Sequence, residues 1–211
     1  MDGIPALIDP PQFLALAAAL GFASGFRLYA AVFFTGLAGF MGWIELPAGL
    51  HVLQHPAVLG ASGFMLFVEF FADKIPYLDS AWDAVHTVIR IPAGAALAAG
   101  ALGADSTAMA WIAALVGGGL AATSHATKMT TRAAVNTSPE PFSNMAVSLF
   151  EDGWVVFLLW LSATHPAIFT VVLVVSVIAA LVLLVLLLKF LQAVARELRD
   201  FFAGRRAPRL P

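Results

Sequence analysis

The sequence predicts an all-α fold, a polytopic membrane helix bundle of about six transmembrane helices in a single membrane domain, residues 1–211. Of the 211 residues, 61% are apolar and only 11% are charged, whereas soluble domains have roughly 25% charged residues. The chain also contains long uncharged runs, and a membrane helix needs about 20 mostly apolar residues. The absence of cysteine excludes disulfides and thiolate metal sites.

Polar and proline-bearing stretches divide the uncharged runs into six predicted spans. The first is too long for one upright crossing and contains five glycines, so we expect a broken or re-entrant first helix, or a tilted one. The last continues without a helix-breaking residue and must project beyond the bilayer. Beyond it we expect a cytoplasmic amphipathic helical tail, residues 190–211. The spans are 12–43, 56–72, 82–103, 108–132, 144–163 and 166–190, and a different split would give five.

Basic residues predict the orientation. They are concentrated at the C-terminal end, which the positive-inside rule places in the cytoplasm. Six spans then put the N-terminus in the cytoplasm too. The loops near 44–55, 104–107 and 163–166 would lie outside, and they contain no Lys or Arg, as the rule requires. The first eleven residues also lack a basic residue, unlike a cleaved signal peptide, so the first span is expected to be retained.

Several charged side chains fall inside the predicted spans. Ionisable groups in a bilayer are costly and rare, and they typically mark a ligand site, a pathway or an ion pair. On the fourth span, spacings of three and four residues place His125, Lys128 and Arg132 on one face. The predicted substrate-binding residues are Arg27, Glu69, Arg90, Lys128, Arg132, Glu151, Asp152 and His125.

These residues also have structural interpretations. Arg90, Arg132, Asp73 and Lys74 are close enough to span ends for their charged groups to extend to the interface. Arg27, Glu69 and Glu151 lie deeper, and the alternative for them is a buried ion pair that fixes helix packing.

The third span carries Asp79, Asp83, His86 and Arg90 on one side, because they are spaced by four, three and four residues. A divalent cation bound by the first three is a weaker interpretation of a loose pattern. An exposed helix start is the simpler one. We therefore assign no metal ligand and expect no cofactor.

Two segments suggest an internal repeat. Residues 21–36 and 119–138 share a small-residue opening, a Ser followed by a cation, and AAV, and FVEFFAD is matched by SLFEDGW. Repeats over 12–103 and 108–190 would have three spans each and therefore opposite topology. The first and fourth spans would then face each other at their glycines and bring the deep charges around a shared cavity. Chance similarity between Ala- and Gly-rich segments is the alternative.

At GFRLYAAVFFTGLAGF, VEFFADKIPYLDSAWD, SHATKMTTRAAVNTSPEPFSN and SLFEDGW, the chain resembles a bacterial integral-membrane family, domain-of-unknown-function family 4126. The resemblance covers about residues 12–190. It implies a small polytopic fold in the bacterial inner membrane, and it implies no activity.

The buried charges lead to a functional hypothesis, a small inner-membrane transporter or a flippase for an anionic lipid headgroup. Buried Arg and Lys would bind the anion, and buried Glu would balance or relay charge. The expected partners are membrane lipids and an anionic small molecule or headgroup. A net charge of −2 gives no basic surface for nucleic acid. The run GLAGFMG at 36–42 would suit helix association, within the chain or in a homo-oligomer.

Two other functions remain open. A structural or assembly protein would use the same charges as ion-pair locks. A membrane enzyme acting on a lipid phosphate through His86 or His125 is the weaker alternative. The sequence contains no GxSxG, HExxH, P-loop or dinucleotide-binding motif. We therefore expect no enzyme activity and assign no catalytic residue.

Overall fold

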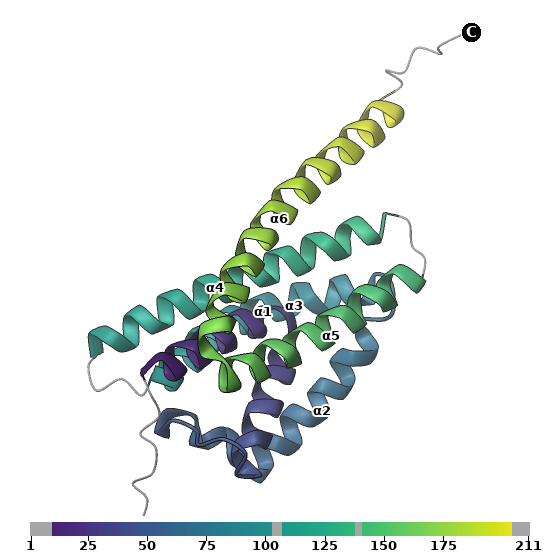
Figure 1. Ribbon diagram of the computed structural model, residues 1–211. Helices are drawn as coiled ribbons and strands as arrows, with labels where there is room; N and C mark the ends of the chain where they lie inside the picture. Colours follow the sequence, from purple (N-terminus) through teal and green to yellow (C-terminus); the bar gives the residue numbers. More distant parts are fainter. Residues whose placement is uncertain (1–9, 103–106, 138–140, 204–211) are drawn as a thin grey trace, which may run out of the picture.

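The computed structural model describes residues 10–102, 107–137 and 141–203, and these form helices joined by short connections (Figure 1). The predicted all-α bundle is confirmed. The elements are α1 (Pro10–Phe40), the 3-10 helix η1 (Ala48–Gln54), α2 (Pro56–Ala72), α3 (Leu78–Leu102), α4 (Thr107–Val135), α5 (Pro141–Thr164) and α6 (Pro166–Phe202).

The helices have the lengths and surfaces of membrane helices. Among the described residues, α1, α3, α4, α5 and α6 are each long and apolar enough to cross a membrane, and η1 with α2, bent by 69°, makes a sixth span if the pair is counted as one. Large apolar side chains such as Trp111, Leu115 and Val175 are exposed on the outside of the bundle. This is the surface expected of helices that face lipid. The predicted five or six spans therefore agree with the structure.

α1 is broken at Arg27, whose φ of −144° and ψ of 79° are not helical. Before the break, α1 runs alongside α4 in the same direction, because Gly21 lies against Gly117 and Gly25 against Ser124. A Cβ on Gly25 would lie 1.9 Å from Ser124 Oγ, so only glycine permits this approach. The predicted break in the first helix and the predicted contact of the first and fourth spans are both confirmed.

After the break, α1 packs against η1 and α2 and returns toward the end of the bundle where it began. Gly36 lies against the carbonyl of Leu53 in η1. Gly49 of η1 in turn lies against Gly100, near the end of α3. The run GLAGFMG therefore packs within the chain at Gly36.

The first and last described residues lie at opposite ends of the bundle (Figure 1). Leu14 lines a small cavity with Leu102 and Met109, at the end of α3 and the start of α4. α6 instead projects past the end at which α4 finishes. The expectation that both termini lie on the cytoplasmic side of the membrane stays a prediction. The predicted tail is helical to Phe202, and residues 204–211 of it lie outside the described residues.

Candidate functional site

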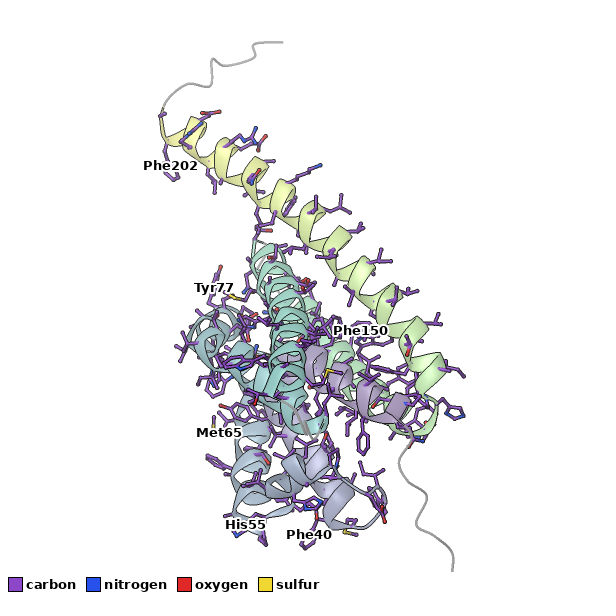
Figure 2. All side chains as sticks on the ribbon, turned by 90° about the vertical axis from the view of Figure 1, so that its left-hand side faces the viewer. Phe40, His55, Met65, Tyr77, Phe150 and Phe202 are labelled. Atoms are coloured by element: carbon purple, nitrogen blue, oxygen red, sulfur yellow. The ribbon has the colours of Figure 1, made fainter. Side chains whose placement is uncertain are left out.

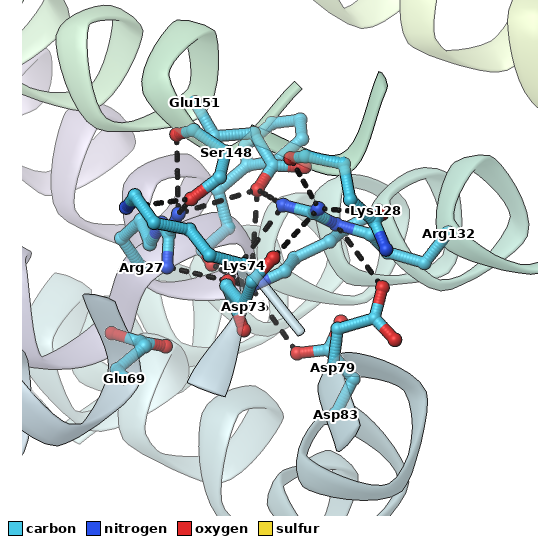
Figure 3. A network of polar contacts seen from close by, with 12 residues as sticks. Arg27, Glu69, Asp73, Lys74, Asp79, Asp83, Lys128, Arg132, Ser148 and Glu151 are labelled. Carbon is cyan, nitrogen blue, oxygen red and sulfur yellow. Dashed lines mark hydrogen bonds and ion pairs between the residues drawn. The ribbon is translucent and has the colours of Figure 1, made fainter. Parts of the chain in front are cut away.

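Eleven charged side chains of the described chain form one connected group, which we call the ion cluster (Figure 3). Every member has a partner of opposite charge within 4.0 Å. The cluster lies between the middle of the bundle and the end at which α2 and α4 finish. Its members are Arg27, Glu69, Asp73, Lys74, Asp79, Asp83, Arg90, Lys128, Arg132, Glu151 and Asp152.

Asp73 occupies the centre of the ion cluster. It caps the C-terminus of α2, and its carboxylate pairs with Arg27 and Lys128, with Arg132 at 3.8 Å. Arg132 also donates to the backbone carbonyl of Asp73 at 3.1 Å. The side chain is fully buried, so the interpretation that it extends to the interface is wrong. Asp73 was not among the predicted binding residues, although its position one turn after Glu69 was the available signal.

The surroundings of Asp73 act on its pKa in opposite directions. Burial alone would raise the pKa of this carboxyl, because it disfavours the charged form. Lys128 and Arg27 outweigh burial and lower the pKa of Asp73 to about 2. Asp73 is therefore a carboxylate at physiological pH.

Arg27 joins the break in α1 to α5. Its Nε lies 3.0 Å from Asp152 and its Nη2 lies 3.7 Å from Glu151. Nη2 also donates to the side chain and the backbone carbonyl of Ser148, at 2.8 and 3.1 Å. A guanidinium presents its donors in a fixed planar fork, which suits several acceptors at once. The side chain is fully buried.

Side chains of α4 contact the backbone carbonyls just before the break. Lys128 Nζ donates to the carbonyl of Phe26 at 3.1 Å, and His125 Nδ1 lies 3.3 Å from the carbonyl of Gly25. A broken membrane helix needs such partners, because its freed carbonyls have no water to bind. His125 and Lys128 therefore stabilise the non-helical backbone at Arg27.

Arg90 holds a second branch of the cluster on α3. It pairs with Glu69 and, at 2.7 Å, with Asp83. Lys128 lies 3.2 Å from Asp83 and so connects this branch to Asp73. His125 contacts Arg90 at 3.3 Å. Arg90 is fully buried, so for it too the interface interpretation is wrong.

Arg132 holds a third branch, between α4 and α5. It pairs with Glu151 at 2.7 Å and donates to the side chain of Asn144 at 3.2 Å. Asn144 donates to Asn136, which donates to Asp79 at 2.9 Å. Arg132 is fully buried, which contradicts its interface interpretation. The amides were not predicted, since nothing in their spacing distinguishes them from ordinary loop residues.

The structure brings all eight predicted residues together: seven belong to the ion cluster, and His125 contacts it through Arg90. The predicted convergence is confirmed. The centre, however, is filled by the charged side chains themselves, since nine of the eleven have side chains no more than 5% exposed.

The members that reach the surface are Lys74 and Asp152, with side chains 16% and 23% exposed. They lie 3.9 Å apart, and Lys74 Nζ also lies 3.0 Å above the ring of Phe70. For Lys74 the interface interpretation is consistent with this partial exposure. This pair is the part of the described cluster that is partly exposed at the protein surface.

The charges of the cluster do not balance. It contains five cationic side chains against six carboxylates. With all six carboxylates ionised and the histidines neutral, the described cluster has one excess negative charge. Such an excess favours binding of a proton or another cation.

Asp79, Asp83 and His86 do not converge on one point. Asp79 contacts Asn136 and Asp83 contacts Arg90, while His86 contacts the hydroxyl of Tyr29 at 3.1 Å. Among the described residues no group of three such side chains is placed to hold a metal ion. The row predicted on one side of α3 is nevertheless buried as a whole, which contradicts the interpretation as an exposed helix start.

The model of a family described as a domain of unknown function, DUF4126, matches residues 14–186. Neither the curated proteins nor the solved structures give a match.

Proposed function

The chain belongs to the DUF4126 family, whose description carries no activity, and we propose from the site that the protein is a small transporter with the ion cluster as its coupling centre. The observation that carries this proposal is the position of the cluster. Charges from five helices meet at the break of α1. Discontinuous helices next to buried ionisable groups are typical of secondary transporters.

The carried or coupling ion is a proton in this proposal. The excess carboxylate can accept a proton with a gain in charge balance, and the partly exposed pair of Lys74 and Asp152 is the proposed entry for that proton. An anionic substrate, expected from the sequence, is less favoured, since it would have to displace a carboxylate from each cation it binds. We place the protein in the bacterial inner membrane, with the C-terminus in the cytoplasm.

The break in α1 supplies the moving part. Arg27 is held by Asp73 from the end of α2 and by Glu151 and Asp152 from α5. Protonation of one of these three carboxylates weakens its ion pair with Arg27. Arg27 is then held more strongly by its remaining partners, on α5 or at the end of α2. A helix already broken at this residue can follow such a change without losing further backbone hydrogen bonds.

Proton movement into liposomes tests the proposal. The full chain is reconstituted with a pH-sensitive dye inside, and inorganic phosphate, benzoate or tetraphenylphosphonium is added outside. We expect a protein-dependent pH change with at least one of these probes, lost in Glu69→Gln or Glu151→Gln. Glu45→Gln is the matched control, because Glu45 is exposed and lies outside the cluster. Unchanged flux in both cluster variants contradicts the proposal.

A structural or assembly role is the second candidate, and the complete pairing of the cluster favours it. Buried pairs that lock helices are common, and removal of one partner costs about 3–5 kcal/mol. Glu151→Gln separates the two candidates. If Glu151 has a structural role, the variant protein loses thermal stability and folded yield. If Glu151 couples transport to protons, the variant loses proton flux but still purifies as a folded protein.

A further inference from the structure

A cavity of about 560 Å³ lies beside the ion cluster, between α1, α4, α5 and α6. Residues of α5 and α6 form much of its lining, and Phe150 lies on the side of the bundle that faces α6 (Figure 2). Its walls are almost wholly apolar and include Phe22, Phe26, Phe150 and Trp154. The volume is in the range of small-molecule sites, roughly 300–1,000 Å³.

Glu151 is the charged residue in the wall of this cavity. Its ion pairs with Arg132, Lys128 and Arg27 all use Oε2. Oε1 has no cation partner among the described residues. The cavity is therefore an apolar, aromatic space with Glu151 in its wall, at the edge of the ion cluster.

From this arrangement we infer that the cavity binds an amphiphilic organic cation, with its apolar body between the aromatic side chains and its charged group toward Glu151. The inference rests on the proposed function and names the substrate class of that transporter. An amine or other organic cation gains from the carboxylate and from the faces of Phe and Trp rings. An anion of the same shape meets excess negative charge without water to screen it.

Two probes of the same shape and opposite charge test the inference. Binding of tetraphenylphosphonium and of tetraphenylborate to the full chain in nanodiscs is measured by equilibrium dialysis, with empty nanodiscs subtracted. We expect the cation to bind at least about tenfold more tightly than the borate, and Glu151→Gln to weaken the cation by about tenfold or more. Equal affinity for the two probes, or no binding above empty nanodiscs, overturns the inference.

A steric variant keeps the test independent of the ion cluster. Ala146→Trp fills the cavity without removing a charge and should abolish cation binding. Ala61→Phe is the control, because Ala61 lines a separate apolar groove between α1, α2 and α3. Unchanged binding in Ala146→Trp overturns the inference.

Failure of the inference is distinguishable from failure of the proposed function. Suppose that benzoate or phosphate drives a proton flux that depends on the glutamates, but tetraphenylphosphonium does not bind. This result refutes the inference of an organic-cation site and leaves the proposed transport function standing. Suppose instead that tetraphenylphosphonium binds in a way that depends on Glu151, but no proton movement is detected. This result supports the cation site and refutes the proposed transport function.

Discussion

Asp73 contacts three of the five cations in the ion cluster and is their shared partner. Its position one turn after Glu69 is a signal in the sequence, but its place at the end of α2 also allows an exposed carboxylate, so the sequence alone does not decide between the two. Such a residue points inward only if the neighbouring helix supplies cationic partners, as α4 does with Lys128 and Arg132. Depth alone did predict that Arg27, Glu69 and Glu151 are buried, since side chains in the middle of a span have few ways to reach water.

At the residue scale, Asp73→Asn should destabilise the protein by about 3–5 kcal/mol, because three buried cations lose a shared carboxylate. Thermal unfolding in detergent measures the change. Asp200→Asn is the control, since Asp200 pairs with Arg199 on the projecting part of α6 and both are solvent-exposed. A melting temperature equal to that of the control would contradict the central place given to Asp73.

The same residue predicts a pH dependence. The pKa of Asp73 is lowered from 3.8 to about 2 in the folded protein. Its contribution to stability is therefore fully present above about pH 4 and is lost as the pH falls toward 2. Unfolding measured between pH 6 and pH 2 should show this loss in the parent. If the stability of Asp73→Asn falls with pH as steeply as that of the parent, the loss of stability comes from other titratable groups.

At the element scale, the glycines of α1 and α4 determine how closely these helices pack. The sequence predicted close approach at both sets of glycines, and Gly21, Gly25 and Gly117 confirm it. It could not predict which glycines face a neighbour. Gly119 has nothing within 4 Å of its missing Cβ, although it is adjacent to Gly117 and Gly118 in the same run.

Gly25→Ala should separate α1 from α4 at the break, because the added Cβ would lie 2.3 Å from the carbonyl oxygen of Ala121. Overpacking of this kind costs about 1–3 kcal/mol or more. Gly119→Ala is the matched control and should gain up to about 1 kcal/mol from helix propensity. Size-exclusion profiles and thermal unfolding report both variants. Equal stability of the two would show that α1 and α4 are not in close contact.

At the scale of the whole molecule, the sequence predicted the helical membrane bundle and its five or six candidate spans. Glycines indicated a break in the first span, and the structure confirms it at Arg27. Composition does not say whether a broken helix continues across the membrane or returns, so the sides on which the termini lie stay a prediction. The inverted repeat stays a prediction.

Single cysteines test this topology, and the natural absence of cysteine leaves no background labelling. Gln12→Cys and His165→Cys should react with a membrane-impermeant maleimide from one side of the membrane. Thr137→Cys and Asp200→Cys should react from the other side, which the positive-inside rule identifies as the cytoplasm. Labelling of residue 12 from the same side as residue 200 would contradict the return of α1.

The central claim, that the ion cluster exchanges a proton, is tested most directly by the charge that moves when pH changes. The full chain on a solid-supported membrane receives a pH jump, and the transient current is recorded without any substrate. We expect a protein-dependent current in the parent and in Glu45→Gln, and its loss in Glu151→Gln. A current that is absent from the parent, or equal in all three proteins, would contradict it.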